Sequence, residues 1–359
     1  MSNPFVKNRA SIKMLQIAGA LVPVLGASIA SASPASTPSP FSFNLVALGN
    51  VGTASSPKTA DVQGTAAIVG NLYGSGWSAG ADAASAAGYS LYVGGTASFA
   101  GGSIGSNGMQ VGGGLTLDNF GSSAPIVSGG NLYGTNSGTL FGPVTLGGTN
   151  QSQLTISGTL EQNQTFSPAF NPGSLTNYFD NFSAAYSVLP STVAANKVVN
   201  QYSTLTINAT SGVQVVDLAA GTFGDQTGVN ITFSGGSDAS NYLIINVPDS
   251  SLSLNYLTFS FNGISASHVL VNAPELTSLT LNSGGNYNLL APSANTDYTS
   301  GSFEGNLIVD NLTGGGESDL GNFFTPPATA VATPEPAAIA LFAVGALGLL
   351  VRRKKALGR

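Results

Sequence analysis

The chain has 359 residues, of which 10 are lysine or arginine, 16 are aspartate or glutamate and none is cysteine. The absence of cysteine excludes disulfide bonds and thiolate metal sites, so an exported form of this chain must be held together by its core. Glycine contributes 47 residues, yet leucine, isoleucine, valine and phenylalanine are too frequent and too regularly placed for a disordered chain.

The basic residues gather near the two ends of the sequence. Three precede residue 14 and five follow residue 351, so only Lys58 and Lys197 lie between them. Fifteen acidic residues precede Glu335, and together with the two lysines they give the central part a net charge of −13. Such a surface repels nucleic-acid phosphates, and no basic patch is present to overcome the repulsion. We therefore expect no nucleic-acid partner.

Residues 1–32 have the pattern of a secretory signal peptide. Three basic residues stand near the start: Lys7, Arg9 and Lys13. A mostly apolar run follows at 14–25, and Ala30 and Ala32 then provide the small residues of a cleavage site. We predict cleavage before Ser33, which leaves a Pro/Ser linker at 33–40 with nothing to bury.

The folded part begins at Phe41, and from there to about residue 159 the sequence repeats. Gly-Gly pairs recur at a nearly constant spacing, each after a short β-favouring stretch: 94–95, 112–113, 129–130 and 147–148. A fixed period of about 18 residues is typical of coils that stack and share one core. We expect the glycines to supply the positive φ values and the close backbone approach that the corners of such coils need. The regular spacing disfavours the alternative, a low-complexity Gly/Ser run.

The stretch from Asn171 to Asn200 interrupts the repeat. Asn171 and Pro172 suit the N-cap and the first position of a helix. Apolar residues then recur every three or four positions: Leu175, Phe179, Phe182, Tyr186 and Leu189. This spacing predicts an amphipathic helix over about 171–189 that packs along the flank of the coils.

From Tyr202 to Asp310 the β pattern returns. Short β-favouring runs, among them STLTI from Ser203, VNITF from Val229 and LSLNYLTFSF from Leu252, are separated by Asn, Asp, Gly and Pro. The patterns together predict a mainly β fold, a right-handed parallel β-solenoid (β-helix) with one flanking amphipathic α-helix.

Two segments of the central part carry a family resemblance. The first, 43–74, has an aromatic-Asn-Leu strand, then Asp-Val-x-Gly and Gly-Asn; the second, 268–276 with 287–324, has Leu-Ala-Pro-x-Ala and Gly-Asn-Leu-Ile-Val. Both are similar to the ends of choice-of-anchor A domains, although the family's His-Asn-x-x-Phe reads Gly-Asn-Phe-Phe at 321–324 and the preceding acid is Asp319. The resemblance covers 41–324 and implies a surface-displayed, adhesive β-helical domain without established catalytic residues.

The C-terminal segment 334–359 follows a linker at 325–333 and forms a second signal. Pro334, Glu335 and Pro336 stand directly before the uncharged run 337–351, and four cations follow: Arg352, Arg353, Lys354 and Lys355. As a helix the run would span about 22 Å, short of a ~30 Å hydrocarbon core, and the cations favour the cytoplasmic side. An ordinary single-span tail or a buried helix is the alternative interpretation.

The order of motif, apolar run and cations resembles a PEP-CTERM sorting signal. This resemblance implies Sec export and processing by an exosortase in a Gram-negative, exopolysaccharide-producing bacterium. The run 337–351 would then be a transmembrane helix that holds an intermediate in the inner membrane. The processed protein would reach the cell surface, the outer envelope or the extracellular matrix of a biofilm.

The central part is poor in residues suited to catalysis or cofactor binding. His268 is the only histidine and stands in a strand-like run, as expected for a structural residue rather than a member of a Ser-His-Asp triad. One histidine without cysteine cannot build a zinc site. We therefore expect no cofactor. A structural calcium ion is the remaining alternative, although the candidate ligands are scattered: Asp61, Asp217, Asp225, Asp238 and Asp310.

Three functions are compatible with the sequence. The first is a non-enzymatic adhesin or matrix component that contacts exopolysaccharide through Thr, Ser, Asn and aromatic ladders. Four aromatic residues either form a sugar-stacking platform or fill the corners of the coils: Tyr73, Trp77, Tyr92 and Tyr133. The second is a polysaccharide-active enzyme, which the lack of arginine in the central part disfavours. The third is an ice-binding-type solenoid, which needs regular Thr-x-Thr rows where the sequence shows only fragments such as Thr204-Leu205-Thr206.

Overall fold

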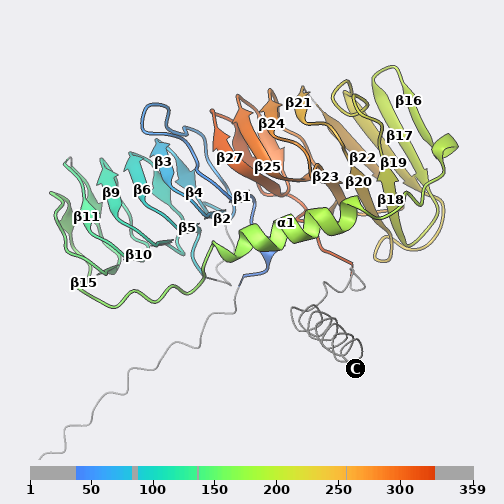
Figure 1. Ribbon diagram of the computed structural model, residues 1–359. Coiled ribbons are helices and arrows are strands. Elements are labelled where there is room, and N and C mark those ends of the chain that lie inside the picture. The colour runs from blue at the N-terminus through green and yellow to red at the C-terminus, as the bar shows by residue number, and fades with distance from the viewer. Residues whose placement is uncertain (1–37, 83–87, 136, 256, 328–359) are drawn as a thin grey trace, which may run out of the picture. The chain divides into compact units, whose positions relative to one another are not determined.

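The structure is a computed structural model that describes residues 38–82, 88–135, 137–255 and 257–327 (Figure 1). The predicted signal peptide at 1–32, the linker before residue 38 and the sorting tail at 334–359 lie outside these residues. Within them the chain is mainly β, with one α-helix, α1 (Ser174–Ser187), and three short 3-10 helices, η1 (Pro40–Ser42), η2 (Ala195–Lys197) and η3 (Ala266–His268). No helix in the described part is long and apolar enough to cross a membrane.

The first half of the chain builds a stack of parallel strands with the predicted period. Met109 pairs with Ile126, and Ile126 pairs with Val144, so the strands of neighbouring coils follow the same spacing as the Gly-Gly pairs. The strands of the main sheet are β1 (Leu45–Ala47), β2 (Ala66–Ile68), β5 (Leu91–Val93), β8 (Met109–Val111), β10 (Ile126–Ser128), β13 (Val144–Leu146) and β15 (Leu160–Glu161).

The coils of this half continue past their corners into further short strands. One row of parallel strands comprises β3 (Leu72–Ser75), β6 (Ala97–Ala100), β9 (Leu115–Asp118) and β11 (Leu132–Tyr133). Two shorter parallel pairs are β4 (Ser78–Ala79) with β7 (Ser103–Ile104), and β12 (Thr139–Leu140) with β14 (Thr155–Ile156).

The Gly-Gly corners depend on close approach and not on an unusual backbone conformation. A Cβ atom on Gly112 would lie 2.2 Å from the carbonyl oxygen of Gly94, and one on Gly129 would lie 2.1 Å from that of Gly112. None of the paired glycines has a positive φ. The prediction of positive φ values at these corners is therefore wrong, whereas the prediction of close backbone contact is confirmed.

The second half of the chain adds strands to the same main sheet, on the other side of β1. Its strands are β18 (Val213–Asp217), β20 (Tyr242–Asn246), β23 (Val269–Asn272), β25 (Asn288–Tyr298) and β27 (Leu307–Thr313). Across the sheet the order is β15-β13-β10-β8-β5-β2-β1-β27-β25-β23-β20-β18. Leu45 of β1 pairs with Leu307 of β27, so the first and last coils meet inside the sheet. These long parallel sheets are compatible with the predicted solenoid.

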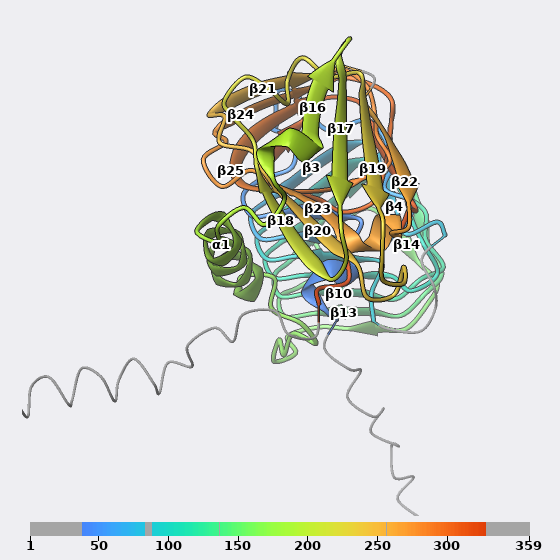
Figure 2. The same ribbon diagram turned by 90° about the vertical axis from the view of Figure 1, so that its right-hand side faces the viewer.

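The second half also forms two smaller sheets and a branch. β16 (Val198–Gln201), β17 (Thr204–Ala209), β19 (Gly228–Phe233) and β22 (Thr258–Asn262) form a four-stranded sheet, in which only the β16–β17 pair is antiparallel (Figure 2). β26 (Ser302–Glu304) pairs with β28 (Glu317–Asp319). β21 (Ser251–Leu254) and β24 (Ser278–Leu281) join β25.

Helix α1 connects the two halves and lies against the main sheet (Figure 1). Its buried Phe179 belongs to an apolar cluster with sheet residues such as Ala67 and Ile244, which confirms the predicted flanking helix. The helix begins at Ser174, slightly later than expected. Asn171 makes the hydrogen bond expected of an N-cap side chain, because it accepts the backbone N–H of Gly173 at 3.0 Å, and residues 172–173 form a turn before the regular helix.

Candidate ligand-binding face

Three parallel strands, β17, β19 and β22, present a regular set of polar side chains on one face. Leu205 and Ile207 of β17 are buried, and the residues between and beside them therefore face outward. The same alternation holds in β19 around Val229 and Ile231. The register aligns nine outward positions, which we call the polar array: Thr204, Thr206, Asn208, Gly228, Asn230, Thr232, Thr258, Ser260 and Asn262.

The polar array repeats in two directions. Thr206, Asn230 and Ser260 form its central row across the strands, where neighbouring residues are about 4.8 Å apart. Along each strand the outward positions recur at every second residue, about 6.7 Å apart. The side chains of the central row make no hydrogen bond to another described residue, so their hydroxyl and amide groups are available to a ligand.

A groove of about 440 Å³ borders the polar array. Asn208 and Thr232 of the array form part of its wall, and Lys197, Gln214 and Ser234 line it as well. The groove therefore extends the hydrogen-bonding surface of the array toward β16.

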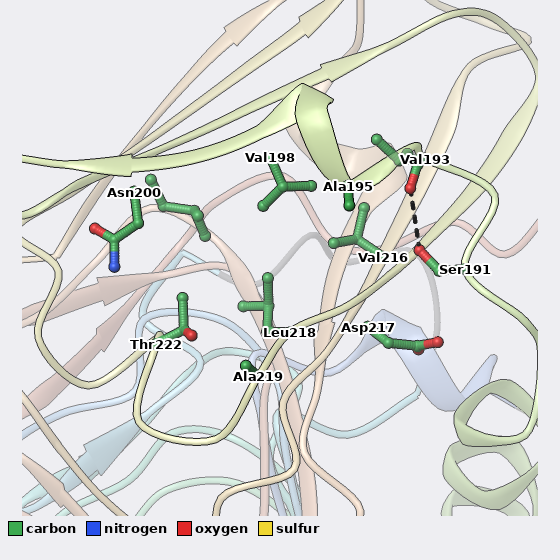
Figure 3. Close-up of a pocket in the computed structure, with 11 residues that line it drawn as sticks. Ser191, Val193, Ala195, Val198, Asn200, Val216, Asp217, Leu218, Ala219 and Thr222 are labelled. Carbon is green, nitrogen blue, oxygen red and sulfur yellow. Dashed lines mark hydrogen bonds between the residues drawn. The ribbon is translucent and has the colours of Figure 1, made fainter.

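A second pocket of about 440 Å³ lies on the inner side of β16 and β17 (Figure 3). Val198, Val216 and Leu218 make much of its wall apolar, and Asn200 and Asp217 add polar groups at its edge. Because side chains alternate along β17, this pocket and the polar array lie on opposite faces of the same sheet.

Asparagines on another row of the fold are already used internally. Asn311 accepts a hydrogen bond from the backbone N–H of Asn50 at 2.7 Å, and Asn50 accepts one from the N–H of Asn71 at 2.8 Å. Asn71 in turn accepts the N–H of Thr96 at 2.8 Å. This ladder holds the corners of successive coils together, which distinguishes it from the unpartnered side chains in the central row of the polar array.

The four candidate aromatic residues do not form one platform. Trp77 and Tyr92 are buried with exposed fractions of 0% and 1%, so they fill the core as the alternative interpretation expected. Tyr73 of β3 and Tyr133 of β11 are at the surface and occupy the ends of one row across four strands. That row lies on the strands of the first half and is separate from the polar array.

The residues considered for catalysis or metal binding are not assembled into a site. The Nδ1 atom of His268 lies 2.8 Å and 3.0 Å from the backbone carbonyl oxygens of Asp238 and Asn241, so it donates to the backbone, and its ring stacks on Tyr242. Within the described ranges, no group of three or more His, Asp or Glu residues has the geometry to hold a metal ion. Asp217 accepts a hydrogen bond from Asn246 at 2.9 Å, and Asp225 and Asp310 are likewise outside any such group.

Some acidic residues do meet on neighbouring strands. Glu304 pairs with Asp319, and Val62 pairs with Ser318, which brings Asp61 beside Glu317. Burial raises the pKa of the Glu317 carboxyl, and the carboxylates of Asp319 and Asp61 raise it further.

Comparison with known families decides the class of this domain. Residues 41–320 match a family described as an ice-binding-like adhesive domain. The chain belongs to this ice-binding-like adhesive family. The match spans both halves of the solenoid and includes the polar array, while the resemblance to choice-of-anchor A domains stays a prediction.

Two further comparisons concern the tail and the fold. Residues 332–355 match the PEP-CTERM protein-sorting motif, which confirms the resemblance noted in the sequence. The motif implies processing by an exosortase, and with the adhesive domain it implies export to the cell surface. No curated protein matches the chain. An ice-binding protein from an Antarctic bacterium, Flavobacteriaceae, is similar in structure, with 11% sequence identity, a TM-score of 0.31 and coverage of 79% of this chain and 82% of that chain.

Proposed function

We propose that this adhesive-domain protein is a non-enzymatic adhesin of the cell surface or extracellular matrix that binds exopolysaccharide through the polar array. The observation that carries the proposal is the register of β17, β19 and β22, which aligns hydroxyl and amide groups in a two-dimensional repeat whose central row has no internal hydrogen-bond partner. Sugar hydroxyls are donors and acceptors, and so are the side chains of Thr, Ser and Asn.

A polymer suits this surface better than a small molecule. The array is an open sheet face rather than a deep cavity, so each contact is weak and affinity must come from many repeated contacts. A polysaccharide repeats its hydroxyl groups along its length in the same way. The acidic central part, with a net charge of −13 from two lysines and fifteen acidic residues, favours a neutral polymer over an acidic one.

The proposed route to the surface uses both terminal signals. The signal peptide is cleaved between Ala32 and Ser33 after Sec export. The run 337–351 then holds the chain in the inner membrane, with the cations at 352–355 on the cytoplasmic side. The exosortase recognises Pro334-Glu335-Pro336 and releases the domain to the outer envelope or to a biofilm matrix of a Gram-negative bacterium.

The same array supports a second candidate, binding to ice. The Thr204-Leu205-Thr206 fragment lies in this array, with Thr204 and Thr206 on its outward face, and the domain belongs to an ice-binding-like adhesive family. The two candidates use one surface but differ in their ligand. One pair of variants therefore tests both.

The test replaces two hydroxyl-bearing residues of the array, Thr206 and Thr232, by valine in the full chain purified in mild detergent. Valine keeps the shape and strand preference of threonine, so only hydrogen bonds are lost. Two lost hydrogen bonds of about 1 kcal/mol each weaken retention on the producing bacterium's exopolysaccharide by at least about tenfold. The measurement is retention on immobilised exopolysaccharide, alongside partition into slowly growing ice.

The matched control is Thr116→Val with Thr145→Val, two half-buried threonines on β9 and β13 away from the array. We expect the control to bind like the wild type. Equal losses in both variants contradict the assignment of the binding face. Retention in ice without retention on the polymer favours the second candidate, and cleavage of the polymer during incubation contradicts a non-enzymatic role.

A further inference from the structure

The hairpin between β16 and β17 has an unusual turn. Gln201 pairs with Thr204, so the loop consists of Tyr202 and Ser203 alone. Their φ angles are 54° and 58°, as in a type I′ turn. That turn normally takes Asn-Gly, because glycine has no Cβ atom and asparagine tolerates the left-handed region better than most other residues. Tyrosine followed by serine is therefore a strained choice at this position.

Neighbouring structure holds the turn in this conformation. The carbonyl oxygen of Ser203 accepts hydrogen bonds from the backbone N–H of Thr227 at 2.8 Å and from that of Gly228 at 3.4 Å. The hydroxyl of Thr227 also donates to this oxygen at 3.2 Å. The tip of the hairpin is thus tied to the beginning of β19, the middle strand of the polar array.

The side chain of Tyr202 contributes nothing to this arrangement. It is 89% exposed, the highest exposed fraction among the large exposed apolar residues of the described chain. It forms no hydrogen bond and no ring contact with another described residue. Strained backbone positions that persist without a local packing benefit are concentrated at functional sites.

Tyr202 also stands at the rim of the binding face. Gln201, directly before it, pairs with Thr204, and Thr204 begins the row that continues through Gly228 and Thr258. The hairpin lies at the edge of the four-stranded sheet, where no further strand covers it (Figure 2). A ligand spread over the array therefore passes beside the tip of the hairpin.

We propose that Tyr202 is an aromatic binding residue that stacks against the apolar face of a pyranose ring in the polymer held by the polar array. This inference rests on the proposed polysaccharide function. Tyrosine suits the role because it combines a rigid apolar ring with a polar hydroxyl and loses little conformational entropy on binding. The array supplies hydrogen bonds to the sugar hydroxyls, and Tyr202 supplies apolar contact with the C–H face of the ring.

The test separates binding from folding with three variants of the full chain in mild detergent. Tyr202→Asn removes the ring but suits the left-handed turn, so we expect an equal or higher melting temperature and retention on the producing bacterium's exopolysaccharide weakened about fivefold. Tyr202→Phe keeps the ring and should bind like the wild type. Ser203→Gly relaxes the turn without touching the ring, and should raise the melting temperature with unchanged binding.

The outcomes distinguish this inference from the function on which it rests. If Tyr202→Asn binds like the wild type while Thr206→Val with Thr232→Val loses binding, Tyr202 is not a binding residue and the adhesin function stands. If Tyr202→Asn loses melting temperature and binding together, its role is structural and the inference is overturned. If the wild type itself is not retained on the exopolysaccharide, the proposed function and the inference both fail.

Discussion

Lys58 is one of only two lysines in the central part of the chain, and it is buried with an exposed fraction of 1%. Its ammonium group donates a hydrogen bond to the carbonyl of Gly316 and lies 5.7 Å from the centre of the Tyr298 ring. Burial lowers the pKa of the Lys58 ammonium to about 8, although the carboxylates of Asp61 and Glu317 act in the opposite direction. A buried charge with this pKa opposes folding at neutral pH.

The pH dependence of stability follows from this shift. Between pH 8 and the ordinary lysine pKa of about 10.5, the unfolded chain keeps a proton that the folded chain has lost. Because stability rises with pH wherever the unfolded state binds more protons, Lys58 should contribute a gain of about 1.5 kcal/mol between pH 8 and pH 9.5. Chemical denaturation at several pH values measures this gain as the difference between the wild type and a variant without Lys58, because tyrosines of the unfolded chain begin to ionise above about pH 9 in both proteins.

In Lys58→Met this gain should disappear, and the variant should be at least as stable as the wild type at pH 7. The matched control is Lys197→Met, because Lys197 is exposed. The control should retain the wild-type pH dependence. If stability rises with pH in Lys58→Met as it does in the wild type, a group other than Lys58 titrates in this range.

At the scale of elements, the corners of the coils need glycine because the neighbouring coil leaves no space for a side chain. The Cβ atom of an alanine at residue 129 would lie 2.1 Å from the carbonyl oxygen of Gly112 and 3.1 Å from the ring of Phe166. The first contact is with backbone, which cannot rotate away as a side chain does. The coil spacing itself must therefore change to accept a side chain here.

We predict that Gly129→Ala lowers the free energy of unfolding by about 1–3 kcal/mol. Gly114→Ala is the matched control. A Cβ atom at this position would lie 3.6 Å from the nearest atom, the carbonyl oxygen of Asn131, and the φ angle of Gly114 is not positive. That variant should stay within about 1 kcal/mol of the wild type. Denaturant titration of both variants measures the difference, and equal effects would contradict the steric explanation.

The elements differ in how far local sequence predicted them. The spacing of Leu175, Phe179 and Tyr186 identified α1, because one apolar stripe every three or four residues has no other regular solution. Its regular part begins after a turn at residues 172–173, which the apolar spacing does not distinguish from the helix itself. The burial of Lys58 could not be predicted because it stands in a polar, unpatterned segment, whereas Lys197 stands beside Val198 and Val199 and is nevertheless exposed.

At the scale of the whole molecule, the two ends of the folded region meet in the middle of the main sheet. β1 and β27 pair in parallel although they lie near opposite ends of the folded region, and Asn44 donates to the carbonyl of Asp319 at 2.6 Å nearby. Deep burial of both strands makes this junction part of the core rather than a loose contact. The two ends of the folded region therefore lie together, as the contact between the rings of Phe41 and Phe324 also shows.

The whole-molecule prediction concerns the sorting tail. Replacing Pro334, Glu335 and Pro336 by alanine in the producing bacterium should leave the protein in the inner-membrane fraction at its unprocessed mass. Pro326→Ala with Pro327→Ala, in the preceding segment, is the control and should be processed normally. Fractionation followed by intact-mass measurement gives the result. If the triple variant still reaches the surface or the medium at the processed mass, the sorting function of this motif is wrong.

The sequence by itself determined the features that depend on local pattern: the repeat marked by the Gly-Gly pairs, the flanking helix and the sorting motif. The tertiary structure alone decided which distant segments share a face. Thr204, Gly228 and Thr258 begin in-register strands that are separated by connections of unequal length. Strand register depends on how the intervening segments pack, and a shift by one residue would turn every array side chain inward. The polar array therefore emerged only when the three strands were placed side by side.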